Sequence, residues 1–525
     1  MSTIDYTTQR IDYVRRASDL ATPSGLDDRD SRLFRRFGWG PARTVPRVGI
    51  HEMIERHAAV RPSVTAAQHG GERISYGELE RRADRLAARL IQGGVSPGDR
   101  VALVVRRGIP MLVGILAILK TGAAYVPQDA KMVRNPALRH ILATANCTIV
   151  LTQSDAPVEL PPGVIGIDID RDGEAADVPV PRIAHDPARA CYVLFTSGTT
   201  GTPNGVAVTH ANLANLLLTE PGDLGIRPGT TVGQILNIAF DMAAWEILGC
   251  LSHGGTLLIR GHDIAATARR VNVLIATPTI LSRIDPEACE GIRTVAVAGE
   301  PCPSALADRW AERAAFYNGC GPTETTIVNT MQRHHPGVRL TIGKPTPNNT
   351  VYLLDEHRNP CPIGAVGEMW AGGDGVSAGY LANPGLNAER YAPDPFLGGG
   401  RTMFRTRDLG RWTLDGELEH LGRTDDQVKV RGFRVELDAV SAVLESVPGC
   451  VRAATVKLDD RTLAAFVQPS GVDPELARKA VAEALPYYCV PESIHLMEAL
   501  PLTDRGKIDK ARLLRLARLG REATA

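Results

Sequence analysis

Short apolar runs recur over about the first 300 residues and alternate with stretches of helical periodicity. The runs are rich in valine, isoleucine and leucine, which is typical of strands buried on both faces. They lie at residues 101–105, 148–152, 192–195, 256–259, 271–276 and 294–298. Because strands alternate with helices, we predict an α/β fold, with a mostly parallel sheet covered by helices.

Two helices are predicted before the first of these runs. Residues 50–57 have apolar side chains at helical spacing, so the first regular helix is expected to start near Gly49. A second amphipathic helix is expected after Ser75, because Ser75 and Glu78 have the spacing of a capping box.

The pattern changes after about residue 340. Closely spaced β runs with glycine turns, as at residues 367–371 and 417–421, predict an antiparallel sheet or a small barrel-like part. Charged β runs and two helices after that part predict a small α+β domain. We predict a lead-in segment at residues 1–45, a large core domain at residues 46–424, and a small C-terminal domain at residues 425–525.

Charge and apolar patterning exclude several classes of function. Among 525 residues, 59 basic side chains balance 59 acidic ones, so there is no overall field to attract nucleic acid or an acidic membrane. The most apolar run, residues 111–126, is interrupted by Lys120 and Gly122 and is shorter than the roughly 20 residues of a spanning helix. We expect a buried helix that runs into a strand.

The N-terminal residues and the cysteines both indicate the cellular compartment. Residues 1–10 lack the apolar core of a signal peptide. The nine cysteines form no Cys-x-x-Cys pair and lie near no histidine cluster, which argues against a zinc site or a disulfide framework. We therefore expect reduced thiols and a cytoplasmic location.

Residues 195–205 read Phe-Thr-Ser-Gly-Thr-Thr-Gly-Thr-Pro-Asn-Gly and predict a phosphate-binding loop. Glycines let backbone N–H groups approach a polyphosphate closely, and hydroxyl side chains add donors without bulk. A loop of this kind usually carries a cation, and Asn204 stands in that place. Alone, such a loop is often merely a turn, so the motifs around it decide the interpretation.

Eight further motifs accompany the loop in order. They occupy residues 74–79, 119–127, 240–247, 318–324, 367–380, 406–409, 422–432 and 501–509. This succession resembles the adenylation domains of nonribosomal peptide synthetases, within the adenylate-forming superfamily of acyl-CoA ligases and luciferases. The resemblance covers about residues 46–512, and nine ordered motifs make chance agreement negligible.

The resemblance implies an activity in two steps. ATP and an amino acid would form an aminoacyl-adenylate and pyrophosphate, with ATP and Mg²⁺ as the cofactors. The aminoacyl group would then pass to the phosphopantetheine thiol of a carrier protein. The first step must bring two anions together and stabilise the charge on the departing pyrophosphate.

The resemblance assigns the chemistry to two residues and the domain motion to a third. Lys507 matches the invariant lysine that bridges the substrate carboxylate and the nucleotide. Glu324 matches the carboxylate that organises magnesium. Asp425 aligns with the hinge about which a mobile C-terminal domain would rotate to present residues 428–432 for the second step.

The nucleotide site is assigned in the same way. Asp408 matches the acid that takes the ribose hydroxyls, Arg423 the arginine beside it, and His420 a residue next to adenine. The ATP-binding set is Thr196, Ser197, Gly198, Thr199, Thr200, Gly201, Asn204, Gly299, Glu300, Asn318, Cys320, Gly321, Thr323, Asp408, His420 and Arg423.

Four positions depart from the family pattern. Asn204 replaces a lysine and adds no charge against pyrophosphate, so we expect slower adenylation. Cys320 replaces an aromatic residue that stacks on adenine. Arg407 replaces the glycine before Asp408 and either brings charge near the nucleotide or points to solvent. Ala439 replaces a glutamate, a surface change expected to have no consequence.

The substrate pocket follows from alignment on the same motifs. Its lining is predicted as Asp241, Met242, Trp245, Ile275, Ala296, Ala298, Gly319, Ile327 and Val328, completed by Lys507. The carboxylate of Asp241 would pair with the α-ammonium of the substrate, which aryl and fatty acids lack. Because the remaining lining is uncharged, a charged substrate side chain would be costly to bury there. We expect a bulky apolar or aromatic amino acid.

Three functions stay open from the sequence. The first is a freestanding amino-acid adenylating enzyme, since the chain ends soon after Lys507 without a Gly-Gly-x-Ser segment; its carrier protein would act in trans, and an MbtH-like helper is a further candidate partner. The second is a carboxylate–CoA ligase, which Asp241 disfavours. The third is a catalytically silent nucleotide- or amino-acid-binding protein, suggested by Asn204 and Cys320.

Overall fold

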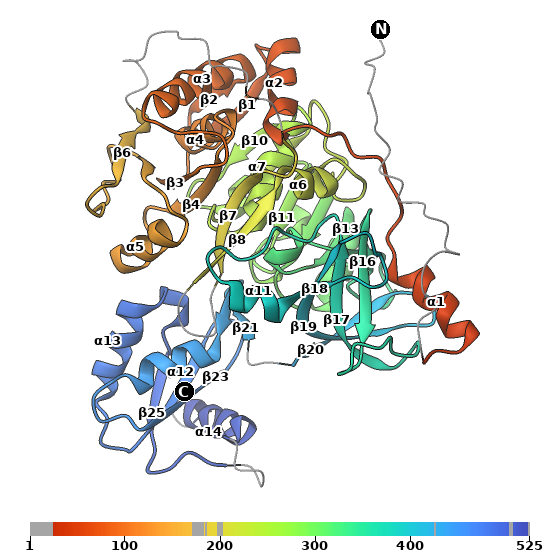
Figure 1. Ribbon diagram of the computed structural model, residues 1–525, viewed down its shortest axis with the longest axis vertical. Helices are drawn as coiled ribbons and strands as arrows, with labels where there is room; N and C mark the ends of the chain where they lie inside the picture. Colours follow the sequence, from red (N-terminus) through yellow and green to blue (C-terminus); the bar gives the residue numbers. More distant parts are fainter. Residues whose placement is uncertain are drawn as a thin grey trace. The chain divides into compact units, whose positions relative to one another are not determined.

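The computed structural model describes residues 25–170, 183, 186–196, 203–424, 427–502 and 508–522 (Figure 1). The chain divides into two compact units, each treated separately below. Unit 1 comprises Met1–Lys131, Thr144–Leu194 and Val206–Thr424, and unit 2 comprises Met132–Ala143, Phe195–Gly205 and Asp425–Ala525. The three-part domain division and the hinge at Asp425 stay predictions, and Asp425 lies outside the described residues.

A six-stranded sheet has the order β6-β5-β3-β4-β7-β8. Its strands are β3 (Arg100–Val105), β4 (Ala124–Asp129), β5 (Ile149–Thr152), β6 (Ile165–Asp168), β7 (Ala190–Thr196) and β8 (Asn204–Thr209). The pairs β3–β4, β3–β5, β4–β7 and β5–β6 are parallel. Helix α4 (Ile109–Lys120) packs against β3 and β4 and is buried on nearly every side, as expected for residues 111–126.

A nine-stranded sheet has the order β15-β14-β13-β12-β11-β9-β10-β1-β2. Its strands are β1 (Thr65–His69), β2 (Glu72–Ser75), β9 (Thr231–Gln234), β10 (Thr256–Ile259), β11 (Val273–Ala276), β12 (Thr294–Val297), β13 (Ala315–Cys320), β14 (Thr330–His334) and β15 (Lys344–Pro345). The central pairs are parallel and the pairs at both edges antiparallel. Every apolar run predicted as a strand lies in one of these two sheets, which confirms the predicted α/β fold.

A third sheet confirms the antiparallel part predicted after residue 340. Its strands are β16 (Asn349–Leu354), β17 (Val366–Gly373), β18 (Tyr391–Pro393), β19 (Thr402–Trp412) and β20 (Leu418–Arg423). All their pairings are antiparallel, and β19 joins β17, β18 and β20.

The helices of unit 1 cover these sheets, and α2, α3 and α4 pack together (Figure 1). Helix α3 (Tyr76–Gln92) begins where predicted, with Ser75 Oγ accepting a hydrogen bond of 3.2 Å from the backbone N–H of Glu78. The other helices are α2 (Ile50–Val60), α6 (His210–Leu217), α7 (Asp241–Ser252), α8 (Ile264–Ala268), α9 (Pro278–Leu281), α10 (Ser304–Ala311) and α11 (Pro384–Arg390), with single 3₁₀ turns η2 (Pro286–Ala288) and η3 (Thr323–Thr325).

The expectation that the first regular helix starts near Gly49 is wrong. Helix α1 (Asp28–Gly38) precedes it, capped by the side chain of Asp27, which accepts a bond of 2.7 Å from Asp30 N. Its aromatic residues are buried, and the ring of Phe34 stacks on Tyr352 of β16 with centroids 5.8 Å apart. These contacts hold the helix to a strand that is more than 300 residues away in sequence.

Unit 2 is an α+β arrangement with its own apolar core. It contains the hairpin β21 (Gln427–Val430) and β22 (Phe433–Glu436), a sheet of β23 (Arg452–Lys457), β24 (Leu463–Gln468) and β25 (Ser493–Leu496), the helices α5 (Asn135–Thr144), α12 (Leu437–Glu445), α13 (Pro474–Ala484) and α14 (Lys510–Glu522), and the turn η4 (Tyr487–Cys489). After residue 425 the described chain thus has three α-helices instead of the two expected. None of the helices in the described ranges is long and apolar enough to cross a membrane.

Candidate functional site

The predicted phosphate loop is described only at its two ends. Thr196 is the last residue of β7 and Asn204 the first of β8, and the hydroxyl of Thr196 lies 3.5 Å from the carbonyl oxygen of Asn204. The remaining residues predicted for the loop and the lysine predicted to be catalytic fall outside the described residues: these are Ser197, Gly198, Thr199, Thr200, Gly201 and Lys507.

The structure brings three of the predicted nucleotide ligands together. Asp408 of β19 faces Arg423 of β20 in the strand register, and Arg423 Nη1 donates a hydrogen bond of 2.6 Å to Asp408 Oδ1. His420 Nε2 lies 3.4 Å from the same oxygen. Burial alone would raise the pKa of Asp408, but the hydrogen bond with His420 and the charge of Arg423 hold it below its ordinary value. This carboxylate is therefore ionised at neutral pH and is oriented by two side chains.

Arg407, directly before Asp408, has a φ of 63°. This left-handed backbone favours glycine, the residue that the resemblance predicts here. The Arg407 guanidinium donates to Glu389 of α11, so it forms an ion pair with this carboxylate. The backbone carbonyl oxygen of Arg407 accepts a hydrogen bond of 2.8 Å from the backbone N–H of Thr424, the last residue of unit 1.

Glu324 lies in the 3₁₀ turn η3 beside Thr323 and is fully buried. The hydroxyl of Tyr380 donates a hydrogen bond of 2.5 Å to Glu324 Oε1, and the carbonyl of Glu324 accepts one of 2.8 Å from Ser377 N. Proteins commonly hold Mg²⁺ with one or two carboxylates together with substrate phosphates, so one oriented carboxylate fits the predicted role. Tyr380 ends the motif at residues 367–380 but was not among the predicted site residues.

Residues predicted for the adenine site and residues predicted for the substrate pocket lie next to one another along β13 and the turn after it. A Cβ on Gly321 would lie 2.7 Å from the Cα of Val328, and one on Gly319 would lie 2.8 Å from Val328 Cγ1. Only glycine fits such an approach, so Gly319 and Val328 are direct neighbours. Cys320 is partly buried, and its carbonyl oxygen accepts a hydrogen bond of 3.0 Å from the backbone N–H of Asn329. The side chain of Asn318 donates to Thr341 O at 2.7 Å.

The other predicted lining residues come from α7 and the ends of neighbouring strands. Ile275 of β11 and Ala296 of β12 face each other in the parallel register. Gly299 has a φ of 86°, and a Cβ there would lie 3.7 Å from Met242 Sδ. The remaining residues are also placed: Ala298 and Ile327 are buried, and Glu300 accepts a hydrogen bond of 2.9 Å from Thr279 N.

Asp241 and Trp245 lie on α7. Asp241 is the first residue of the helix and is partly exposed, and its Oδ1 accepts a hydrogen bond of 2.8 Å from Met242 N. Trp245 is fully buried, and its indole N–H donates to the carbonyl oxygen of Gly222 at 2.7 Å. The indole is thus held firmly in the core of unit 1.

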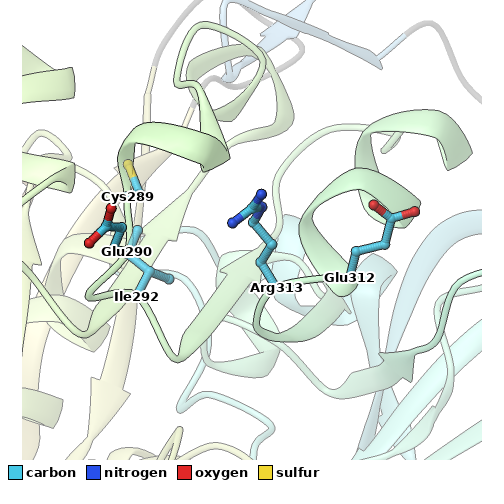
Figure 2. A pocket seen from close by; sticks show the side chains of 5 residues that line it. All are labelled: Cys289, Glu290, Ile292, Glu312 and Arg313. Atoms are coloured by element: carbon cyan, nitrogen blue, oxygen red, sulfur yellow. The ribbon is translucent and has the colours of Figure 1, made fainter.

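A pocket of about 370 Å³ lies elsewhere in unit 1 (Figure 2). It is lined by Cys289, Glu290, Ile292, Glu312 and Arg313, none of which belongs to a predicted site. The Arg313 guanidinium pairs with Glu287. Among the described residues, no group of three or more His, Cys, Asp or Glu side chains could hold a metal ion.

The chain is similar to several known proteins. Residues 54–381 match the family described as AMP-binding enzyme. The chain is 46% identical over 517 residues to adenylate-forming reductase 03009 of Coprinopsis cinerea, covering 97% of this chain and 50% of that protein. It is 35% identical over 492 residues to novobiocin biosynthesis protein H of Streptomyces niveus, covering 88% and 82%.

Among solved structures, the chain is similar to holo-PA1221, a nonribosomal peptide synthetase protein that contains adenylation and PCP domains and is bound to a vinylsulfonamide inhibitor. The TM-score is 0.80 with 25% identity, over 92% of this chain and 85% of that one.

The fold and the ordered motifs thus define an adenylate-forming domain of the type found in nonribosomal peptide synthetases, which confirms the resemblance. The chain belongs to the family of AMP-binding enzymes. It spans about half the length of adenylate-forming reductases 03009 and 06235, with 50% and 49% covered.

Proposed function

We propose that this chain activates an α-amino acid with a bulky apolar or aromatic side chain. An oxygen of the amino acid's carboxylate bonds to the α-phosphorus of ATP, and the bond from that phosphorus to pyrophosphate breaks. The thiol of a carrier protein's phosphopantetheine arm then bonds to the activated carbonyl carbon, loses its proton, and displaces AMP. A cytoplasmic location and a carrier in trans belong to this proposal, and an MbtH-like helper stays a candidate partner.

Asp241 carries the proposal. It places a carboxylate at the start of α7, next to Met242, which neighbours Gly299. The other predicted lining residues in the described chain are uncharged, so Asp241 suits a substrate that has an ammonium group beside an apolar side chain. An acid without this ammonium would bring no positive charge to the Asp241 carboxylate.

The nucleotide is assigned to the residues around Asp408. Its ionised carboxylate, fixed by Arg423, would accept hydrogen bonds from the ribose hydroxyls. Glu324, oriented by Tyr380, would hold Mg²⁺, which neutralises charge on the phosphates. Lys507 would offset the repulsion between the carboxylate and the α-phosphate, as its motif implies.

Amino-acid-dependent exchange of pyrophosphate into ATP tests the proposal. Exchange should be strongest with bulky apolar and aromatic amino acids and weak with the same compounds lacking the amino group. Asp241→Ala should abolish that preference for the amino group. If folded protein supplied with an MbtH-like helper exchanges with no amino acid, the proposal fails and a silent binding protein is favoured.

A second candidate comes from the relatives with the highest identity given above, which are named adenylate-forming reductases. In this case the activated acyl group would be destined for reduction, and the substrate need not carry an amino group. Pyrophosphate exchange with aryl or aliphatic acids, exceeding that with every amino acid, would favour this function. An assay that compares CoA with a carrier protein as the acceptor of the acyl group distinguishes both of these functions from a carboxylate–CoA ligase.

A further inference from the structure

A buried carboxylate lies five residues after Asp241 in the same helix. Glu246 of α7 has no exposed surface, although the residues around it in the helix are apolar. Its Oε1 accepts hydrogen bonds from the backbone N–H groups of Ile235 at 2.8 Å and of Leu236 at 3.2 Å. Its Oε2 accepts one of 3.1 Å from the side-chain amide of Gln234 and one of 3.2 Å from the backbone N–H of Leu236. Glu246 therefore holds the chain just after β9 ends.

The same stretch, residues 234–240, is held from two further sides. The guanidinium of Arg107 donates to the carbonyl oxygen of Gln234 at 3.1 Å and to its Oε1 at 2.7 Å. The side-chain amide of Asn237 donates to Asp129 Oδ2, at the end of β4, at 3.0 Å. We call residues 234–240 the entry segment, because they lead directly into Asp241.

Residues 235–240 of the entry segment belong to no strand, so their backbone N–H groups need other acceptors once they are buried. Side chains in a helix lean toward its N-terminus, so Glu246 is placed to reach back over the first turn of α7 to these groups. A carboxylate is costly to bury, and an apolar side chain would pack at this position without that cost. The carboxylate is explained by the chain segment that it fixes.

We propose that Glu246 is a positioning residue for amino-group recognition: by fixing the entry segment it sets where α7 begins and hence where Asp241 meets the substrate ammonium. The part that concerns the ammonium rests on the proposed function. The part that concerns the entry segment stands on the hydrogen bonds alone.

Three variants test this proposal. Glu246→Ala removes both acceptor oxygens, whereas Glu246→Gln keeps one oxygen that can still accept from Ile235 and Leu236. Asp394→Asn is the matched control, because Asp394 is also a buried carboxylate, and it accepts backbone hydrogen bonds of 2.9 Å from Phe396 and Leu397. Each variant is first checked for folding, and the Gln variant keeps the test valid if the Ala variant does not fold.

Pyrophosphate exchange then gives the kinetic readout. With Glu246→Ala we expect the KM for the amino acid to rise about tenfold, the effect of losing a buried hydrogen bond, while the KM for ATP changes less than about twofold. The Gln variant should recover most of the affinity, and Asp394→Asn should leave both KM values unchanged. In an Asp241→Ala background, Glu246→Ala should add little, because the two residues act on the same contact. Equal effects on both KM values, or full additivity with Asp241→Ala, would overturn the proposal.

Hydrogen–deuterium exchange gives a readout that does not depend on activity. The amides of Ile235 and Leu236 should exchange at least about tenfold faster in Glu246→Ala and stay protected in Asp394→Asn. If the wild type activates no amino acid, the proposed function fails, and this measurement still decides whether Glu246 fixes the entry segment. Unchanged exchange at these two amides would refute that role.

Discussion

The hydroxyl of Tyr380 donates a hydrogen bond of 2.5 Å to Oε1 of Glu324, and both side chains are buried. The two residues are 56 positions apart in sequence and come from the turn η3 and the segment after β17. A hydrogen bond to one oxygen restricts the orientation of a carboxyl group, so Tyr380 helps to orient the side chain of Glu324. If Glu324 organises Mg²⁺, Tyr380 controls that role without touching the nucleotide.

Tyr380→Phe should therefore weaken the use of magnesium. Removing the hydroxyl leaves a buried carboxylate with one partner fewer, at a cost of about 1–3 kcal/mol. We expect the Mg²⁺ concentration for half-maximal pyrophosphate exchange to rise several-fold, measured by titration at saturating ATP. Tyr391→Phe is the control, since its hydroxyl lies 2.8 Å from the uncharged Ser377 Oγ. An equal shift in both variants would mean that Tyr380 has only a packing role.

The left-handed backbone of Arg407 predicts an unusual order of stability among its variants. Glycine adopts a φ of 63° without the strain that any Cβ brings, so Arg407→Gly should be more stable than Arg407→Ala by about 1 kcal/mol. Both variants lose the ion pair with Glu389, so that loss cancels in the comparison. Urea unfolding of the two variants measures the difference.

Arg405 on the same strand provides the matched control. It also pairs with a carboxylate, Glu368, at 2.8 Å, and it is not among the residues with positive φ. At this position alanine should be the more stable by about 0.5–1 kcal/mol, because glycine weakens an ordinary strand. The same order at both positions would show that the Arg407 backbone is not strained. Since Glu389 already binds the guanidinium, Arg407→Gly should also leave pyrophosphate exchange unchanged.

The elements read correctly from the sequence are those whose signal is local. The run at residues 101–105 forms β3 because its side chains are buried on both faces, and the Ser75 cap starts α3 as the spacing indicates. Helix α1 was missed because its burial depends on partners such as Tyr352, more than 300 residues away. The sequence around a helix does not show which distant residues will pack against it.

In the candidate site, too, the sequence predicted some residues and missed contacts that depend on the three-dimensional structure. The ordered motifs placed Asp408 and Arg423 in one site, and their facing positions on β19 and β20 bring them into contact. The motifs gave no reason to link Tyr380 with Glu324, or Glu246 with the segment before Asp241, because these contacts depend on three-dimensional packing. Arg407 was identified as a replaced glycine, but its backbone conformation and its partner Glu389 became visible only in the structure.

Glu246 should make the protein less stable as the pH rises. Burial raises the pKa of its carboxyl group to about 8, although the backbone N–H group of Ile235 and the charge of Arg107 act against the shift. A carboxyl that holds its proton more tightly in the folded state stabilises the fold fully below its unfolded pKa, near 4.5, and this contribution is lost as the pH rises toward 8. Unfolding midpoints between pH 5 and pH 8.5 should therefore decline more steeply in the wild type than in Glu246→Gln. Parallel curves would mean that Glu246 does not titrate in this range.

Asn204→Lys should accelerate adenylation. Asn204 begins β8 at the end of the predicted phosphate loop, where a lysine would add a positive charge to offset the negative charge of the departing pyrophosphate. We expect several-fold faster pyrophosphate exchange, with a gain that shrinks as salt rises because screening weakens a partly exposed charge. Asn204→Gln is the control, since it lengthens the side chain without adding charge. An unchanged rate in Asn204→Lys, with the protein folded, would show that another group already neutralises the pyrophosphate, and that the asparagine does not limit the reaction.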